Sequence, residues 1–475
     1  MLRVNNIYKK VFTFDDQLTF AKLSGDYNPL HLDEVLARRL LFGSPIVHGV
    51  HLLLWSLDCW LNNSSQLIEF KSIKASFLKP LNVGEKVSLS WESNNENSVR
   101  MKLIADNVIL SIFEFKWHQS EEQNLGNIKK HYPKKIKPVI VKASEIENKS
   151  GHLNYYLNSE TTSMMFPYLI KYFSTIQISI ILATTRLVGT KCPGLNSIYS
   201  ELNLVFNRIK KVTTLKYFVE KFDKRFSIVN MKLLGHGFDG SIKAFLRPER
   251  KKQNTYKQIK KEVEKGEFHN QRALIIGGSR GLGEVTAKLL AAGSADVKLT
   301  YYKGKDDADR IVKEINSNGG SSDFFQYNVI CPDEDLFYRE LNNWSPTHLY
   351  FFATPFIFSG TKGVLSPNLF DKFGEYYVSG FIKIMNMVKP LGLKSVFYPS
   401  TVAIDELPYN MAEYVSAKIA GEMICKYYEK NNINIYRPRL PRLDTDQTVN
   451  LFHIQNKNPV PVQLKHLRFL RDGVH

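Results

Sequence analysis

The first of three regions in the chain combines helical and strand-like patterns of hydrophobic and polar residues. Within residues 16–61, a polar Asn-Pro loop and a second, glycine-containing turn precede a long apolar helix. Alternating hydrophobic positions then predict strands, at 67–80, 86–93 and 98–117. This order predicts one long central helix wrapped by an antiparallel sheet.

The second region, about 150–248, is a diverged copy of the first. Segments starting at Met101 and Met231 share Met-Lys-Leu, Ser-Ile and a closing Phe at a constant offset of 130 residues. The apolar stretch 166–189 would then be the second central helix. The nearest candidate for a membrane span is 164–185, but Pro167 and Lys171 interrupt it, which favours a buried helix.

The third region alternates strands and helices. After a Lys/Gln/Glu-rich stretch that reads as a solvated helix or linker, residues 272–302 give an apolar strand, a glycine turn, a helix and a second strand. Such βα units predict a parallel, doubly wound sheet. We therefore predict four segments, at 1–130, 131–248, 249–268 (the linker) and 269–475.

Length and composition fit a multidomain globular protein. The chain has 475 residues, of which 43% are hydrophobic and 23% are charged. Its four cysteines are scattered without metal-ligand spacing, so we expect neither a disulfide framework nor a metal site. The N-terminal segment lacks a signal-like apolar run, and we expect a cytoplasmic protein without a membrane anchor.

The net charge of +18 limits the classes of partner. Basic residues are dispersed among acidic ones and no nucleic-acid recognition motif accompanies them, so we do not expect a nucleic-acid partner. An acidic carrier protein or a phosphate-bearing cofactor remains compatible with this charge.

Asp26 and His31 are candidates for acid/base chemistry in the first region. They lie five residues apart in SGDYNPLHLD, where a Pro-containing loop can aim a carboxylate and an imidazole at one point. Gly49, in PIVHGVHLLL, falls at the start of the apolar helix, where unpaired N–H groups can hold a developing oxyanion. The alternative is that Asp26 caps a helix and His31 is a partly buried surface histidine.

SGDYNPLHLD followed by FGSPIVHG resembles the MaoC-like hydratases, the R-specific enoyl-CoA hydratases and 3-hydroxyacyl dehydratases with a hot-dog fold. The resemblance implies that Asp26 and His31 are the catalytic pair and that Gly49 supplies the oxyanion donor. Ser24, Asn28 and His48 are then expected to shape the loop or the pocket.

The diverged copy offers only His152 and Glu160 at comparable positions, without the Asp and His spacing. We interpret it as the silent partner of an α+β double hot-dog that helps to wall an acyl-chain tunnel.

A glycine-rich turn in the third region predicts a dinucleotide site. Gly277, Gly281 and Gly283 form GxxxGxG between an apolar strand and a helix, where backbone N–H groups can approach a pyrophosphate. The following strand ends in TYYKGK, and no acidic residue stands there for the ribose hydroxyls. Cations at Arg280, Lys303 and Lys305 therefore favour NADPH, with NADH as the alternative.

Tyr414 and Lys418 form YxxxK in EYVSAKIAGE, one helical turn apart. A nearby ammonium can lower the pKa of a phenol that exchanges a proton with a carbonyl oxygen. Together with the glycine turn and YPSTVAIDELPYNMAEY, this motif resembles the short-chain dehydrogenase/reductases over about residues 270–450. The resemblance implies a Rossmann-type domain and a carbonyl-polarising hydroxyl from Thr401, with Ser400 as the other candidate. It implies cofactor contacts from Gly277, Ser279, Arg280, Gly281, Leu282, Gly283, Lys303, Ala353, Tyr414 and Lys418.

Three positions depart from that family. The usual Asn-Ala-Gly is Ala353-Thr354-Pro355, and Tyr377 stands where an Asn often completes the proton relay. The usual Pro-Gly after the sixth strand is missing from RPRLPRLDTDQT, although Thr445 and Asp446 match the typical Thr-Asp. These departures bear on turnover more than on cofactor binding.

The sequence thus predicts a bifunctional enzyme of fatty-acid or polyketide-type metabolism. It would combine a 3-hydroxyacyl-thioester dehydratase (2-enoyl hydratase) with an NADPH-dependent 3-oxoacyl-thioester reductase. The substrate would be an acyl-CoA or acyl carrier protein thioester, and a homo-oligomer formed through the reductase domain is compatible with the resemblance. The alternatives are a dehydratase with a catalytically weak nucleotide-binding domain, or a non-catalytic carrier-docking scaffold.

Overall fold

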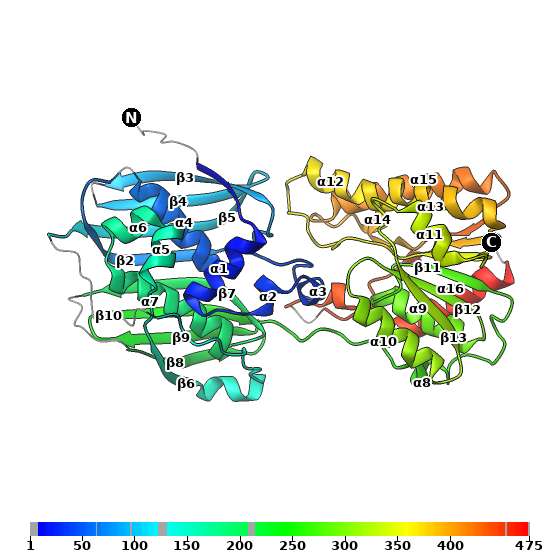
Figure 1. Ribbon diagram of the computed structural model, residues 1–475, viewed down its shortest axis with the longest axis horizontal. Helices are drawn as coiled ribbons and strands as arrows, with labels where there is room; N and C mark the ends of the chain where they lie inside the picture. Colours follow the sequence, from blue (N-terminus) through cyan, green and yellow to red (C-terminus); the bar gives the residue numbers. More distant parts are fainter. Residues whose placement is uncertain are drawn as a thin grey trace. The chain divides into compact units, whose positions relative to one another are not determined.

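The chain folds into two compact units, one made of residues 1–249 with a short segment at 450–453, and the other of residues 250–449 and 454–475. They are shown in Figure 1. The computed structural model describes residues 8–62, 64–95, 97–121, 131–207, 214–451 and 454–473. The boundary predicted at 130 lies outside these residues.

The first unit contains a ten-stranded sheet in which every neighbouring pair is antiparallel. In spatial order the strands are β1 (Tyr8–Val11), β3 (Lys86–Asn95), β4 (Ser98–Ala105), β5 (Val108–Gln119), β2 (Ile68–Phe77), β7 (Ser197–Phe206), β10 (Phe238–Leu246), β9 (Ile228–Gly235), β8 (Thr214–Asp223) and β6 (Ser150–Asn154).

The sheet consists of two halves with the same strand arrangement, joined where β2 pairs with β7. From each outer edge inward, the order β1-β3-β4-β5-β2 corresponds to β6-β8-β9-β10-β7. The strands β9 and β10 each begin 130 residues after β4 and β5. The repeat inferred from the sequence offset therefore corresponds to a repeat of topology.

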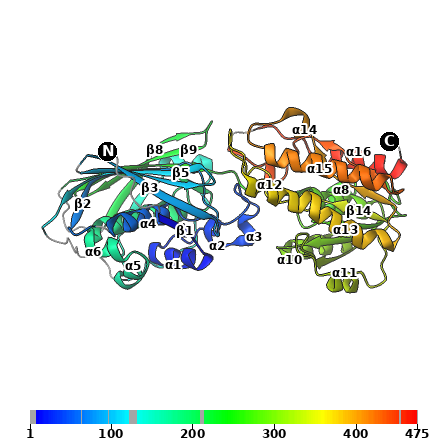
Figure 2. The ribbon, with the colours of Figure 1, turned by 90° about the horizontal axis from the view of Figure 1, so that it is seen from above.

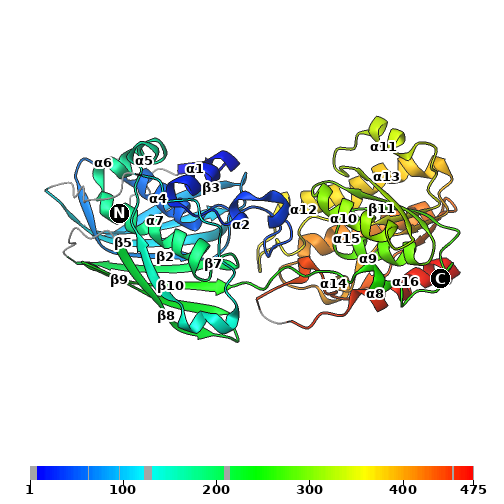
Figure 3. The ribbon, with the colours of Figure 1, turned by 60° about the horizontal axis from the view of Figure 1, so that its bottom comes forward.

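Each half carries one central helix on the same side of the sheet: Figure 3 shows α4 and α7, and Figure 2 shows α4 from another side. In α4 (Gly49–Leu61) and α7 (Thr175–Arg186), nearly every side chain is buried, because each helix lies between the sheet and further helices. The remaining helical segments of this unit are α1 (Phe14–Ser24), α2 (Pro29–Leu32), α3 (Glu34–Ala37), η1 (Ala143–Asn148), α5 (Ser159–Met165), α6 (Pro167–Tyr172) and η2 (Leu187–Lys191).

The second unit has a six-stranded parallel sheet with the spatial order 3-2-1-4-5-6 of doubly wound dinucleotide-binding folds. Its strands are β13 (Ser321–Gln326), β12 (Asp296–Tyr301), β11 (Arg272–Ile276), β14 (His348–Phe351), β15 (Ser395–Phe397) and β17 (Asn434–Tyr436). A two-stranded ladder joins β16 (Ser400–Thr401) to β18 (Arg439–Leu440). The Rossmann-type architecture predicted from the βα rhythm is confirmed.

Two hydrophobic cores cover opposite faces of this parallel sheet. Ile275 belongs to one core and its neighbour Ile276 to the other, because successive side chains of a strand point to opposite faces. The first core packs against α9 (Gly281–Ala292), α10 (Lys305–Asn316) and α16 (Pro459–Asp472), and the second against α11 (Glu334–Leu341), α13 (Gly380–Val388) and α15 (Ala412–Glu429). The shorter helical segments are α8 (Tyr256–Ile259), α12 (Pro367–Gly374), η3 (Glu375–Ser379), η4 (Lys389–Leu391), α14 (Ala403–Glu406) and η5 (Asp446–Thr448).

The charged stretch 249–268 differs from the predicted linker. From Arg250 on it belongs to the second unit, and Tyr256, Ile259, Val263 and Phe268 are buried in the core that contains α9. These four apolar side chains fix the stretch against the sheet's helices although many charged residues surround them. The apolar stretch 166–189 is divided among α6, α7 and η2, and no described helix combines the length and apolar character needed to cross a membrane.

Candidate active sites

The loop that carries Asp26 and His31 is formed by an interruption between two helices. The first helix, α1, ends at Ser24, and Gly25 follows with a φ of +79°. A Cβ at Gly25 would lie 2.7 Å from Pro133, so both the backbone conformation and the space require glycine. The next helix, α2, begins at Pro29 and is capped by the Asn28 side chain, which accepts from Leu30 N at 3.1 Å.

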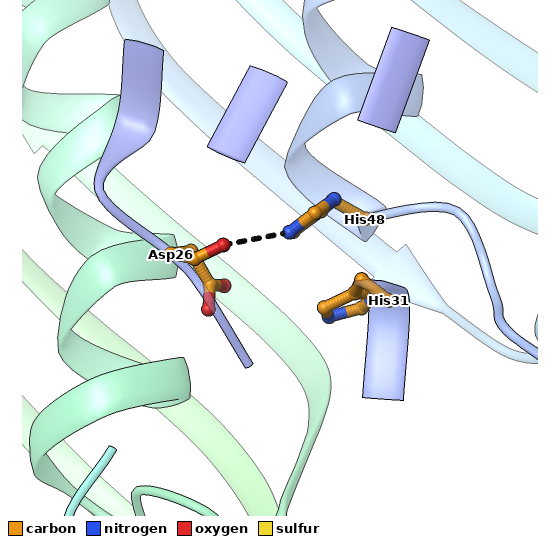
Figure 4. Close-up of side chains that lie close together, drawn as sticks. All are labelled: Asp26, His31 and His48. Atoms are coloured by element: carbon orange, nitrogen blue, oxygen red, sulfur yellow. Dashed lines mark hydrogen bonds between the residues drawn. The ribbon is translucent and has the colours of Figure 1, made fainter. Parts of the chain in front are cut away.

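The structure brings Asp26 and His31 together, as Figure 4 shows. One side-chain ligand atom from each of Asp26, His31 and His48 lies within 4.8 Å of the others. The Nδ1 atom of His31 is 2.8 Å from the carbonyl oxygen of Ile46. A carbonyl can only accept, so this contact places the proton of a neutral His31 on Nδ1 and leaves Nε2 as an acceptor.

His48 contacts both residues of the Asp26–His31 pair. Its ring stacks on the His31 ring with 3.7 Å between centroids, and its Nε2 lies 3.1 Å from the backbone oxygen of Asp26. Its Nδ1 lies 3.0 Å from the Gln17 side-chain amide. The spacing of Asp26, His31 and His48 would suit a metal ion, but both ring nitrogens of His48 are already engaged, which favours a positioning role.

Burial is the largest cause of the pKa shifts of both Asp26 and His31. It raises the pKa of Asp26, and the neighbouring His31 and the Thr185 hydroxyl oppose this rise. Burial lowers the pKa of His31, and the Asp26 carboxylate opposes that fall. A neutral imidazole at neutral pH is suited to accept a proton.

Gly49 occupies the first position of α4, as the sequence predicts. At this position a backbone N–H has no intrahelical acceptor. A Cβ there would lie 2.9 Å from the Phe77 ring, so a side chain could be added only if Phe77 moved.

The second half lacks an equivalent pair. His152 lies on β6, the outermost strand of that half, and Glu160 lies in the first turn of α5; both side chains are exposed. The second half does reach the first site, because the Asn28 amide donates to the carbonyl oxygens of Gly189 and Gly194 at 3.2 Å each.

The glycine turn of the second unit lies between β11 and α9. Gly277 has a φ of +82°, and a Cβ there would lie 2.8 Å from the Ala353 nitrogen. A Cβ at Gly283 would lie 2.2 Å from the Gly277 oxygen. Both positions thus require glycine, and the backbone forms a cradle at the N-terminus of α9 that fits a dinucleotide pyrophosphate. Ser279 and Leu282 lie within this turn and the first helical turn after it.

Arg280 and Lys303, two of the cations expected to bind a 2′-phosphate, contact different kinds of group. Arg280 Nη1 donates to the Asp446 carboxylate at 3.0 Å, so Asp446 neutralises the charge of this arginine. Lys303 follows the end of β12, with its ammonium over the Tyr302 ring.

Tyr414 and Lys418 lie on α15 and are both buried. Burial raises the pKa of Tyr414 to about 12, opposed by a hydrogen bond with Thr401. Burial also lowers the pKa of Lys418 to about 7. This differs from the expected lowering of the phenol pKa by Lys418, because the Lys418 ammonium is directed to the Pro399 oxygen, 2.7 Å away.

The structure separates the two hydroxyl candidates. Thr401 hydrogen-bonds with Tyr414, whereas the Ser400 hydroxyl donates to Glu422 at 2.5 Å. Thr401 is thus the hydroxyl placed beside the phenol.

Tyr377, which we expect from the sequence to stand in place of a relay Asn, contacts the same group of residues. Its ring lies 4.0 Å from the Lys418 ammonium and packs edge-on against Tyr414, while its hydroxyl hydrogen-bonds with Thr354. Two of the departures from the reductase pattern, Tyr377 and Thr354, therefore contact one another.

Thr185 could not be identified from a motif, and the motif match of Asp446 did not indicate its ion pair with Arg280. Thr185 lies within an apolar helix, and Asp446 matches a typical Thr-Asp whose ion pair with Arg280 depends on the folded chain.

Parts of the chain are similar to known proteins. Residues 4–110 match the family described as MaoC like domain. A 3-oxoacyl-[acyl-carrier-protein] reductase of Synechocystis sp. is 44% identical over 64 residues, covering 14% of this chain and 26% of the relative. A peroxisomal hydratase-dehydrogenase-epimerase of Saccharomyces cerevisiae is 25% identical over 126 residues, covering 24% and 13%. A 3-hydroxybutyryl-CoA dehydratase of Methylorubrum extorquens is 42% identical over 48 residues, covering 10% and 31%.

These alignments therefore span less than a third of each of these relatives. Among solved structures, an angucycline C-6 ketoreductase with bound NADP is 19% identical, with 44% of this chain and 91% of that chain covered and a TM-score of 0.40. The segment 4–110, which contains Asp26, His31 and Gly49, is a MaoC-like domain.

Proposed function

We propose that the chain is a bifunctional acyl-thioester enzyme. The first unit, which we infer to be a double hot-dog, would hydrate 2-enoyl thioesters or dehydrate 3-hydroxyacyl thioesters. The second would reduce 3-oxoacyl thioesters with NADPH. The observation that carries the proposal is the Asp26 carboxylate facing His31, whose Nδ1 is held by the Ile46 oxygen inside a MaoC-like domain.

In the first site, Asp26 and His31 converge on a point where a water can be held. One of the two groups can take a proton from that water as its oxygen adds to C3, and the same proton is then delivered to C2, so that water supplies both the hydroxyl and the hydrogen. The thioester oxygen gains negative charge during this step, and the Gly49 N–H is suited to stabilise it. Dehydration is the reverse of these transfers.

In the second site, the nicotinamide cofactor supplies the hydride when bound. The glycine turn would hold its pyrophosphate, with Lys303 near the 2′-phosphate. Tyr414 carries its proton at neutral pH because its pKa is about 12, so it can protonate the carbonyl oxygen of a 3-oxoacyl substrate. Thr401 would donate to the same oxygen.

The two reactions are consecutive, because reduction of a 3-oxoacyl thioester gives the 3-hydroxyacyl species that dehydration consumes. The test is to incubate the purified protein with acetoacetyl and crotonyl thioesters, on CoA and on acyl carrier protein, and to follow nicotinamide and enoyl absorbance. Activity in both assays supports the proposal, and inactivity in both contradicts it.

NADPH should bind more tightly than NADH in calorimetry, because a lysine can make charge-assisted contacts with the 2′-phosphate. Lys303→Ala should weaken NADPH binding and leave NADH binding unchanged. Lys313→Ala, an exposed cation on α10, is the control that should change neither. Equal affinity of the wild-type protein for both nucleotides would reject a phosphate pocket.

Thr401→Val should lower the reductase rate by about 10²-fold, the usual loss when one oxyanion donor is removed. Ser400→Ala should lower it less, because the Ser400 hydroxyl is directed to Glu422. Steady-state rates with acetoacetyl thioester distinguish the two, and the reverse ranking would assign the polarising role to Ser400.

A second candidate function is a dehydratase whose nucleotide-binding unit turns over weakly. The Tyr377 ring covers the Lys418 ammonium where a relay would need access to it, and this contact favours the candidate.

A further inference from the structure

The end of α7, in the second half of the first unit, contacts the Asp26 carboxylate of the first half. Thr185 Oγ1 donates to Asp26 Oδ2 at 2.7 Å, across 159 residues of sequence. Both residues are buried, with 3% and 2% of their surfaces exposed. A hydroxyl bonded to a buried carboxylate in this way forms a strong, directional contact.

The backbone that follows α7 closes around the same carboxylate. A Cβ at Gly189 would lie 2.0 Å from Asp26 Oδ1, so no side chain fits at this position without moving Asp26. The Asn28 amide donates to the Gly189 oxygen, which attaches the catalytic loop to this turn. Thr185 and Gly189 thus contact the two carboxylate oxygens from one segment.

The two oxygens of Asp26 receive different donors. Oδ1 accepts from the Asn28 backbone N–H at 3.2 Å, which is a contact within the loop itself. Oδ2 accepts from Thr185, which is a contact from the other half. Together the two bonds fix the rotation of the carboxylate that faces His31.

We propose that the half without an acid/base pair orients the Asp26 carboxylate of the other half, with Thr185 as the positioning residue. This inference rests on the proposed hydratase function. The second half would then be required for catalysis as well as for walling the substrate tunnel.

Two variants of Thr185 separate its hydroxyl from its volume. Thr185→Val has nearly the same shape but no hydroxyl, so it should lower kcat for enoyl hydration by about 10- to 100-fold, as expected for a hydrogen bond to a charged group. KM should change little, because Thr185 contacts Asp26 and not the substrate. Thr185→Ser keeps the hydroxyl and should restore most of kcat.

The pH profile distinguishes positioning from packing. The Thr185 hydrogen bond stabilises the carboxylate and lowers the Asp26 pKa, so its removal should raise that pKa. The acid limb of kcat/KM should therefore move to higher pH in Thr185→Val and return in Thr185→Ser. The matched control is Thr184→Val, because the buried Thr184 hydroxyl donates to the Ile181 oxygen; it should leave the limb in place.

Thermal melting provides a readout that does not depend on activity. The hydrogen bond matters most when Asp26 is ionised, so the difference in Tm between Thr185→Ser and Thr185→Val should widen as the pH rises through the raised pKa of Asp26. The inference is overturned if the acid limb of Thr185→Val lies where it does in Thr184→Val and if the Tm difference between Thr185→Ser and Thr185→Val does not change with pH. If the wild type lacks hydratase activity, the proposed function fails, and the Tm comparison still decides whether Thr185 stabilises the Asp26 carboxylate.

Discussion

Replacement of Tyr414 by Phe should abolish NADPH oxidation with a 3-oxoacyl thioester and leave NADPH binding intact. Tyr414 is the phenol of the YxxxK motif, and it is buried beside Thr401 with a pKa near 12. Phe keeps the ring that packs against Phe373 and Tyr377 but removes the proton that the carbonyl oxygen must receive. Stopped-flow or steady-state absorbance of the nicotinamide measures the loss of NADPH oxidation, and calorimetry measures NADPH binding.

Tyr427→Phe is the matched control for this variant. Tyr427 lies on the same helix but is exposed, so loss of its hydroxyl should change neither activity nor binding. Residual reduction at the wild-type rate in Tyr414→Phe would remove Tyr414 from the mechanism. Hydration of crotonyl thioester should be unaffected in both variants.

A wild-type protein that binds NADPH without reducing any 3-oxoacyl thioester would point to Tyr377. The Tyr377 ring covers the Lys418 ammonium at 4.0 Å, and its hydroxyl contacts Thr354. Tyr377→Asn is then the variant that should restore reduction, because it uncovers Lys418. In that case the dehydratase-only function becomes the better description of the chain.

The periodic parts of the sequence predicted the fold well. Alternation of strands and helices gives the parallel sheet, and the glycines at 277 and 283 mark a turn in which a Cβ would meet backbone atoms. The 130-residue offset predicted a repeat because a strand pair conserves its spacing even when its side chains diverge. The packing of the charged stretch after Glu249 was not predicted, because a few buried residues such as Tyr256 hold it in the core although most of its residues are charged.

The sites were predictable only where their residues lie close in sequence. The loop from Asp26 to His31 brings its own side chains together, so motif spacing suffices. The Thr185 bond to Asp26 and the Arg280 ion pair with Asp446 join residues more than 150 positions apart. The direction of the Lys418 ammonium toward the Pro399 oxygen likewise depends on tertiary packing, which a helical i, i+4 pattern does not specify.

Asp26→Asn and His31→Ala should each lower hydration of a 2-enoyl thioester by about 10²–10⁴-fold, the usual contribution of a positioned proton transfer. Asn can still accept the Thr185 hydrogen bond but cannot take a proton, and Ala removes the imidazole whose Nδ1 is fixed by Ile46. Loss of enoyl absorbance measures the rate, and NADPH oxidation should survive in both variants.

The controls for this prediction come from the second half. His152→Ala and Glu160→Gln change exposed residues that lie outside the Asp26 site, so hydration should continue at the wild-type rate. Full hydratase activity in either Asp26→Asn or His31→Ala would reject the assigned pair. Loss of activity in His152→Ala or Glu160→Gln would instead show that the second half contains a working site. A strong effect at Asp26, no effect at His152 and a partial, pH-dependent effect at Thr185 would together assign proton transfer to one half and orientation of its carboxylate to the other.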